Sequence, residues 1–260
     1  MCLKAVGEYM KLDDFDIVLF DLDGTVYYGS KLIDGANDTI NFFRNAGKRI
    51  YFATNNSTKT RKQIFEKLVK IGVDCKFEEV LTSGYLAALY AQQENLHDMY
   101  IFGSENLRTE FDEMGVSYNQ TENAENLLIG YNPAMTYDDI ADALQVALHA
   151  RTIIACNKER VFPGEGKRLM PGCGAMTAPI EWCANRECDV IIGKPSTTMI
   201  ELIAEKERTP SYRLLIIGDT YESDIVMAKL AGAKHILISK AAEHHDTAVV
   251  KKIADIREMF

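Results

Sequence analysis

Short apolar segments alternate with amphipathic helical segments along most of the chain. Several of these segments are nearly continuous apolar runs instead of alternations of apolar and polar positions: 17–20, 49–53, 190–192, 214–217 and 236–238. Continuous apolarity is typical of strands that are covered on both faces, as in a parallel sheet. The pattern therefore predicts buried parallel strands.

The segments between these runs carry helical periodicity. The predicted helices are 36–46, 60–71, 197–207, 223–230 and 246–259. Gly47, Gly72 and Gly232 lie one or two residues past the ends of three of them, and glycine is the usual residue just past a helix end. Strand–helix–strand alternation predicts right-handed βαβ units and an α/β fold, with a doubly wound, Rossmann-like parallel sheet.

The middle of the chain has strands and helices of its own. Its predicted strands are 99–102, 127–131 and 152–156, and its predicted helices are 106–114 and 136–150. Two passages rich in proline, glycine and charge, 115–126 and 159–174, are interpreted as long loops. We therefore expect an α/β domain over 84–188, inserted between the two parts of a core domain, 1–83 and 189–260.

Composition narrows the class of protein. Of 260 residues, 47% are hydrophobic and 26% are charged, as in soluble globular proteins, and the net charge is −9. An acidic balance disfavours binding to nucleic acid or to an anionic membrane surface. No apolar stretch is long enough for a membrane span, and the cysteines form no CxxC pair. We expect a cytoplasmic protein with reduced thiols and neither a nucleic-acid nor a membrane partner.

Polar residues of different kinds follow four of the predicted core strands. They are Asp21 and Asp23 after 17–20, Thr54, Asn55 and Asn56 after 50–53, Lys194 after 190–192, and Asp219 and Asp224 after 214–217. In an open α/β sheet, ligands bind beyond the carboxyl ends of the strands, so these side chains are expected to converge.

Each group by itself has a structural interpretation, such as a solvated turn for Asp21–Gly24 or a helix cap for Thr54. An EF-hand is excluded because Val26 and Leu32 occupy the positions of its glycine and its last acid. Together, the groups supply a carboxylate nucleophile, a second carboxylate, a hydroxyl donor, a cation and an acidic metal pair. These are the parts that phosphoryl transfer through an aspartyl-phosphate requires.

Four ordered motifs resemble those of the haloacid dehalogenase (HAD) superfamily. They are Phe20-Asp21-Leu22-Asp23-Gly24-Thr25, Ala53-Thr54-Asn55-Asn56-Ser57, Gly193-Lys194-Pro195-Ser196, and Gly218-Asp219 with Asp224-Ile225. The second motif and the run Pro171-Gly172-Cys173-Gly174-Ala175 resemble the NagD-type, para-nitrophenyl-phosphatase-like class with a C2 cap. The resemblance covers the chain nearly end to end. Thr220 and Ser223 depart from the usual residues, and neither departure removes a ligand.

The resemblance implies a Mg²⁺-dependent phosphatase that hydrolyses small-molecule phosphate monoesters, such as sugar, nucleotide or related phosphates. Asp21 would be the nucleophile and Asp23 the general acid and base. Thr54 and the amide of Asn55 would hold the phosphoryl oxygens, and Lys194 would offset the charge of the transition state. Asn56 would reach the substrate near the phosphate.

The resemblance also implies the metal ligands and the role of the inserted domain. Mg²⁺ would bind the Asp21 and Asp219 carboxylates and the Asp23 backbone carbonyl, and Asp224 would act through a metal-bound water or orient Lys194. The inserted domain would close over the site.

The substrate's leaving group has two candidate readers in the inserted domain. The first is the loop 157–170, whose Arg160, Phe162, Lys167 and Arg168 would contact it, unless this is simply a solvated basic loop. The second is the strand end Tyr131-Asn132. A homodimer through the inserted domain is also expected from the resemblance.

Two other classes of function stay open at this point. One is a catalytically silent sensor of phosphorylated metabolites, and the other is a receiver-like phosphoacceptor module. A receiver has its metal-binding acids on an earlier strand than its acceptor, whereas Asp21 and Asp23 follow the same strand. Turnover of para-nitrophenyl phosphate with Mg²⁺ separates an enzyme from a sensor.

Overall fold

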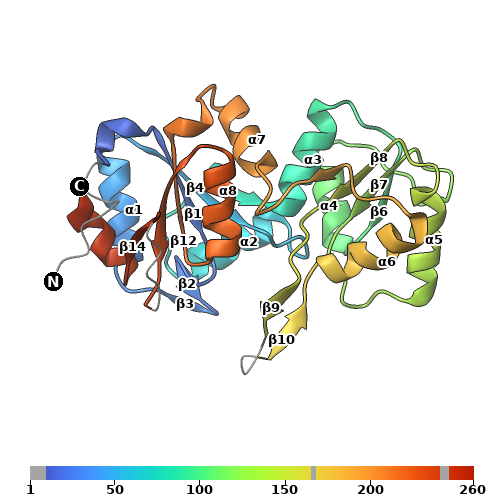
Figure 1. Cartoon of the computed structure of the whole chain (residues 1–260), viewed down its shortest axis with the longest axis horizontal. Helices are drawn as coiled ribbons and strands as arrows, with labels where there is room; N and C mark the ends of the chain where they lie inside the picture. Colours follow the sequence, from blue (N-terminus) through green and yellow to red (C-terminus); the bar gives the residue numbers. More distant parts are fainter. Residues whose placement is uncertain (1–9, 165–167, 241–245) are drawn as a thin grey trace. The chain divides into compact units, whose positions relative to one another are not determined.

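The computed structural model describes residues 10–164, 168–240 and 246–260. The chain divides into two compact units (Figure 1). Unit 1 contains the chain up to Thr54 together with Ile64–Leu81 and Ile200–Phe260, and unit 2 contains Asn55–Gln63 and Thr82–Met199. The segments 55–63 and 189–199, which the sequence assigns to the core domain, thus group with unit 2.

Unit 1 is built on a parallel sheet, which confirms the predicted α/β class. Among the described residues the strand order is β14-β13-β12-β1-β4-β5. The strands are β1 (Ile17–Asp21), β4 (Arg49–Thr54), β5 (Val80–Thr82), β12 (Leu214–Gly218), β13 (Lys234–Ile238) and β14 (Ala248–Val250). The apolar residues of β1 and β12 are buried without alternation, as strands covered on both faces require.

Helices and short elements surround this sheet (Figure 1). They are α1 (Ala36–Asn45), α2 (Arg61–Lys70), α7 (Thr198–Lys206), α8 (Val226–Leu230), a π-helical turn (Tyr221–Ile225), the hairpin β2 (Tyr27–Tyr28) and β3 (Lys31–Leu32), and short 3₁₀ helices at Leu12–Asp14, Phe77–Glu79, Ser211–Arg213 and Ile253–Met259. One core cluster joins Val18 and Phe20 of β1 to Ile40 and Phe43 of α1. Val18 and Phe20 are two residues apart, so they point to the same face of the sheet.

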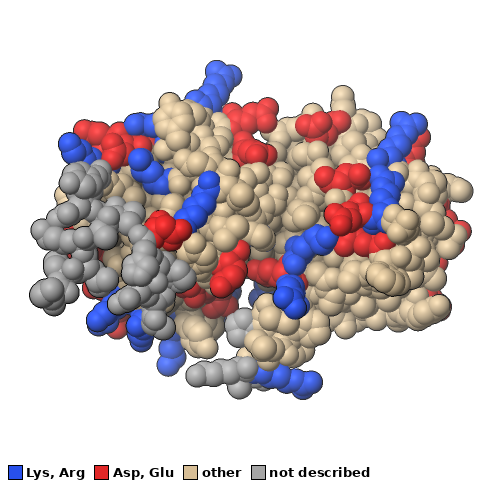
Figure 2. Space-filling model, viewed as in Figure 1, with Lys and Arg blue, Asp and Glu red and all other residues tan. Residues whose placement is uncertain are grey.

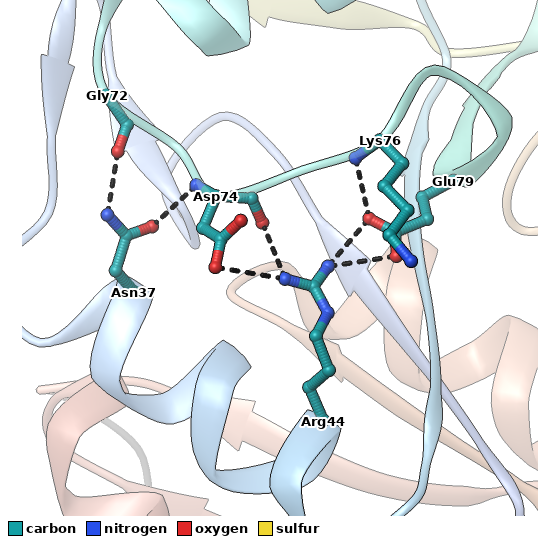
Figure 3. Close-up of polar contacts among 6 residues, drawn as sticks. All are labelled: Asn37, Arg44, Gly72, Asp74, Lys76 and Glu79. Atoms are coloured by element: carbon teal, nitrogen blue, oxygen red, sulfur yellow. Dashed lines mark hydrogen bonds and ion pairs between the residues drawn. The ribbon is translucent and has the colours of Figure 1, made fainter.

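A polar cluster ties the segment that precedes β5 to α1 (Figure 3). Arg44 of α1 donates to both carboxylate oxygens of Glu79, at 2.9 and 2.7 Å, and pairs with the Asp74 carboxylate at 3.1 Å. Asn37, two turns earlier on the same face of α1, donates to the Gly72 carbonyl at 2.7 Å and accepts from the Asp74 N–H at 3.0 Å. These contacts hold the segment against α1.

Unit 2 has a second parallel sheet, with the order β11-β8-β7-β6. Its elements are α3 (Ser83–Gln93), β6 (Met99–Phe102), α4 (Glu105–Glu113), β7 (Asn126–Ile129), α5 (Tyr137–Ala147), β8 (Thr152–Ala155), α6 (Gly174–Ala184) and β11 (Val190–Ile191). Tyr100, Ile129 and Ile153 from the sheet pack with Val146 of α5 and Met176 of α6. An antiparallel hairpin, β9 (Val161–Pro163) with β10 (Leu169–Pro171), extends from this unit (Figure 1).

Three sequence predictions about elements were wrong. The run 190–192 does not join the core sheet, because β11 pairs with β8, Val190 opposite Ile154. The passage 159–174 is not a plain loop, since it forms the β9–β10 hairpin and the start of α6. The segment 246–259 is not one helix: it contains β14, which completes the sheet edge beside β13, and the 3₁₀ helix Ile253–Met259.

Figure 2 shows acidic and basic side chains interspersed over the drawn face of each unit. No helix within the described ranges has the length and apolarity that crossing a bilayer requires.

Candidate active site

Three carboxylates meet at the carboxyl ends of β1 and β12. The two strands are parallel neighbours, with Phe20 opposite Ile217, so Asp21 and Asp219 extend from the same edge of the sheet. Asp224 comes from the π-helical turn that follows β12. One oxygen from each of the three carboxylates lies within 4.8 Å of the others, and Asp21 is half-buried, Asp219 exposed and Asp224 buried.

Two glycines leave the space that these carboxylates occupy. Gly24 has φ +96°, and a Cβ atom there would lie 2.1 Å from Asp219 Oδ2. A Cβ atom on Gly218 would lie 2.3 Å from Asp224 Oδ2. Both distances are far below van der Waals contact, so glycine is required at both positions for the carboxylates to stay where they are.

Thr220 bonds two of the same acids. Its backbone N–H donates to Asp224 Oδ2 at 3.2 Å, and its hydroxyl donates to Asp219 Oδ1 at 3.4 Å. The threonine that departs from the family motif therefore helps to orient both carboxylates.

Asp23 belongs to the tight turn that links β1 to the β2–β3 hairpin. The Gly24 N–H donates to the Tyr27 carbonyl at 2.7 Å, which closes the turn. Asp23 is exposed, and its Oδ1 accepts a long bond of 3.5 Å from the Gly29 N–H. The Asp23 carboxyl is therefore accessible to solvent on a turn that is closed by hydrogen bonds.

A second group of predicted residues meets in unit 2. The Asn55 side chain donates from Nδ2 to the Lys194 carbonyl at 3.0 Å and accepts at Oδ1 from the Lys194 N–H at 2.9 Å. A Cβ atom on Gly193 would lie 2.3 Å from Asn55 Oδ1, so the approach needs a glycine there. Lys194 is 3% exposed.

The remaining predicted residues are divided between the two units. Thr54 ends β4 in unit 1 and is joined by one peptide bond to Asn55 of unit 2. Asn56 Oδ1 accepts from the backbone N–H groups of Thr58, at 3.0 Å, and Lys59, at 2.9 Å, so this side chain forms the turn before α2.

The structure also brings together the two candidate readers of the leaving group. The rings of Tyr131 and Phe162 meet edge to face, with centroids 5.6 Å apart. Lys167 lies outside the described residues, whereas Arg168 is exposed beside β10. Sequence reasoning missed Glu159, whose carboxylate accepts from Asn55 Nδ2 at 2.9 Å, because a lone glutamate in a charged passage carries no signal.

Two buried thiols, Cys156 and Cys173, are poor nucleophiles in this structure. Burial raises the pKa of Cys173 to about 12, and it raises the pKa of the fully buried Cys156 well above its ordinary value. Both therefore stay protonated at neutral pH, and only a thiolate is a good nucleophile.

Two family models match this chain. Residues 18–117 match haloacid dehalogenase-like hydrolases, and residues 191–256 match a second HAD-hydrolase-like model. The first range includes Asp21, Asp23 and Thr54, and the second includes Lys194 and Asp219.

Similar proteins extend the match over most of the chain. The sugar-phosphatase AraL of Bacillus subtilis is 34% identical over 85% of this chain and 82% of its own. The structure of the 4-nitrophenylphosphatase of Thermotoga maritima is 26% identical, covers 95% of this chain and 98% of its own, and has a TM-score of 0.86. NagD of E. coli K-12, at 23% identity, covers 93% of this chain and 98% of its own and shares the fold with a TM-score of 0.82.

These matches agree with the four motifs and with the cluster of carboxylates at the edge of the sheet. The chain belongs to the haloacid dehalogenase-like hydrolases of the NagD and p-nitrophenylphosphatase type, and it is a phosphate-ester hydrolase.

Proposed function

We propose that this hydrolase is a Mg²⁺-dependent phosphatase of small-molecule phosphate monoesters that works through an aspartyl-phosphate on Asp21. The observation that carries the proposal is the convergence of the Asp21, Asp219 and Asp224 carboxylates within 4.8 Å. Carboxylates this close repel one another unless a cation or protons offset their charge.

The donor set of the site fits Mg²⁺. Carboxylate oxygens are the ligands this hard cation prefers, together with backbone carbonyls and water. Asp21 and Asp219 would bind through their side chains and Asp23 through its carbonyl, with Asp224 binding through water or orienting Lys194. When bound, Mg²⁺ would reduce the repulsion between the anionic phosphate and the Asp21 carboxylate.

Asp21 and Asp23 divide the chemistry in two steps. An Asp21 carboxylate oxygen forms a bond to phosphorus while the bond from phosphorus to the leaving oxygen breaks, and Asp23 donates its proton to that oxygen. The Asp23 carboxylate then takes a proton from water, whose oxygen attacks phosphorus and releases inorganic phosphate and Asp21. The exposure of Asp23 supports this role, because it must meet both an ester oxygen and water.

Thr54, Asn55 and Lys194 would hold the phosphoryl group. The Thr54 hydroxyl and the Asn55 backbone N–H are donors for phosphoryl oxygens, and the Lys194 ammonium offsets the charge that develops in the transition state. Asn56 retains its proposed place near the substrate, although its side-chain oxygen is engaged in a turn.

Selectivity for the leaving group is assigned to unit 2. Phe162 of the hairpin and Tyr131 pack together and offer one aromatic surface, with Arg168 nearby in sequence. A sugar-phosphatase and a 4-nitrophenylphosphatase are among the similar proteins, which supports hexose and pentose phosphates and para-nitrophenyl phosphate as the first substrates to try. A homodimer through unit 2 and a cytoplasmic location remain predictions.

The test uses purified protein and para-nitrophenyl phosphate. Activity is expected with Mg²⁺, to be lost with excess EDTA and to return with added Mg²⁺. Asp34→Asn, which changes an exposed aspartate outside the site, is the control for Asp21→Asn. Binding of phosphate esters without turnover would instead indicate a sensor, and a stable phosphoprotein without turnover would indicate a receiver-like module.

A further inference from the structure

The Asn55 side chain connects Lys194 to a glutamate outside all four motifs. Asn55 Nδ2 donates to Glu159 Oε1 at 2.9 Å and to the Lys194 carbonyl at 3.0 Å, while Oδ1 accepts from the Lys194 N–H at 2.9 Å. Both N–H groups of the amide thus have acceptors, and its oxygen has a donor. The Asn55 side chain therefore holds both backbone polar groups of Lys194, its N–H and its carbonyl.

Glu159 is itself held firmly by its backbone. Its N–H donates to Asn157 Oδ1 at 3.1 Å, and its carbonyl accepts from the Gly174 N–H at 2.8 Å. A Cβ atom on Gly172 would lie 2.3 Å from that carbonyl oxygen, which explains one glycine of the Gly-Cys-Gly run. Asn157 Nδ2 also donates to the Asn55 carbonyl at 2.8 Å, so one asparagine supports both partners.

We propose that Glu159 is a positioning residue for Lys194 and acts through the Asn55 amide. The inference rests on the proposed function, in which the Lys194 ammonium offsets charge in the transition state. A carboxylate is a stronger acceptor than a neutral group, so Glu159 holds the amide in the orientation that places Oδ1 toward the Lys194 N–H. Lys194 is 3% exposed, and its long side chain starts from a backbone that this network fixes.

The first test compares Glu159→Ala with Glu159→Gln. Glutamine keeps an acceptor for Asn55 Nδ2, so its kcat/KM for para-nitrophenyl phosphate is expected within about threefold of the wild-type value. Alanine removes the acceptor, and kcat/KM is expected to fall on the order of ten- to a hundredfold, the scale of a displaced catalytic group.

Two further readouts separate positioning from general damage. Vanadate resembles the transition state of phosphoryl transfer. In Glu159→Ala its inhibition constant is therefore expected to rise by the same factor by which kcat/KM falls. The Mg²⁺ concentration at half activation is expected to stay unchanged, because Asp21, Asp219 and Asp224 are untouched.

A reversal of the hydrogen bond gives the sharpest check. Asn55→Asp removes the Nδ2 donor and sets a second carboxylate against Glu159, so activity is expected to fall. Adding Glu159→Gln supplies a side-chain amide N–H that donates to the carboxylate at position 55. The double variant is therefore expected to recover part of the activity that Asn55→Asp loses. Asn126→Asp is the matched control, since Asn126 is a buried asparagine of unit 2 whose Nδ2 donates to the His97 carbonyl at 2.7 Å, away from Asn55 and Glu159 in the sequence.

Lys194→Met distinguishes failure of the inference from failure of the proposed function. If Lys194→Met keeps wild-type activity, the proposed role of Lys194 is wrong. If Lys194→Met is inactive while Glu159→Ala matches the wild type in both kcat/KM and vanadate inhibition, only the inference is overturned. It is also overturned if the double variant is no better than Asn55→Asp, or if Glu159→Ala loses activity only in step with its melting temperature.

Discussion

Gly24→Ala is expected to weaken the proposed Mg²⁺ site through a single methyl group. The added Cβ would lie 2.1 Å from Asp219 Oδ2 and 2.6 Å from Asp219 Cγ. To reach ordinary contact, the carboxylate must move by more than about 1 Å, whereas metal–ligand distances tolerate only about 0.2 Å. The Mg²⁺ concentration at half activation is therefore expected to rise by roughly 10–100-fold.

Gly29→Ala is the matched control for this change. Gly29 lies in the same turn region and also has a positive φ, +61°, but a Cβ atom there meets nothing within 4 Å. Both variants place alanine in left-handed backbone and are expected to lose about 1–2 kcal/mol of unfolding free energy. Only Gly24→Ala is expected to shift the Mg²⁺ dependence.

The assay measures para-nitrophenyl phosphate hydrolysis against free Mg²⁺ for the wild type and both variants, with urea denaturation of each. Superimposable Mg²⁺ curves for Gly24→Ala and wild type would refute the assignment of Asp219 as a ligand. An equal rise of the Mg²⁺ concentration at half activation in both variants would mean that backbone strain alone causes the effect.

Three further predictions concern metal binding and stability. Mg²⁺ is expected to raise the melting temperature of the wild type but not that of Asp219→Asn. In EDTA, Asp219→Asn is expected to melt no lower than the wild type, because it lacks one of the mutually repelling charges. A Mg²⁺-dependent rise in Asp219→Asn equal to that of the wild type, in differential scanning calorimetry, would contradict this. Burial raises the pKa of Glu110 from 4.5 to about 7, although the hydrogen bond from the Arg61 N–H acts in the opposite direction and lowers it. Since the folded state keeps this proton to a higher pH than the unfolded state, the contribution of Glu110 to the unfolding free energy falls between about pH 4.5 and 7. The advantage of Glu110→Gln over wild type in unfolding free energy is therefore expected to be larger at pH 8 than at pH 4, by up to about 3 kcal/mol. Urea denaturation that shows the same difference at both pH values would count against this. Arg44→Met removes the paired bonds to Glu79 and is expected to cost about 1–3 kcal/mol in unfolding free energy with unchanged kcat/KM, and a loss below about 0.5 kcal/mol would mean that the cluster of Figure 3 contributes little.

The apolar runs of the sequence were sufficient to predict the α/β class and most strands. Ile17–Phe20 and Leu214–Ile217 are buried on both faces, and this leaves no polar position within either run. The sequence did not show which sheet a short strand joins. Val190–Ile191 pairs with β8, next to the bond of 2.7 Å from the Ile153 N–H to the Asp189 carboxylate. Two apolar residues do not indicate in the sequence which strand they will pair with.

The convergence of three motif carboxylates was predictable from the sequence, whereas their catalytic roles stay predictions. Asp21, Asp219 and Asp224 converge because β1 and β12 are neighbours with their carboxyl ends at one edge. The supporting contacts were not predictable. Thr220 bonds two of these acids, and Glu159 bonds Asn55, through pairings that depend on side-chain positions and leave no pattern in residue spacing.

The central claim is that phosphate passes through Asp21. The most direct measurement mixes the enzyme with excess para-nitrophenyl phosphate and Mg²⁺, quenches within milliseconds, reduces with borohydride and maps the peptides by mass spectrometry. Borohydride converts an aspartyl-phosphate to homoserine, so homoserine is expected at position 21 in the wild type and not in Asp21→Asn. Homoserine at another aspartate, or its absence at position 21 during a kinetic burst of nitrophenol, would contradict the account.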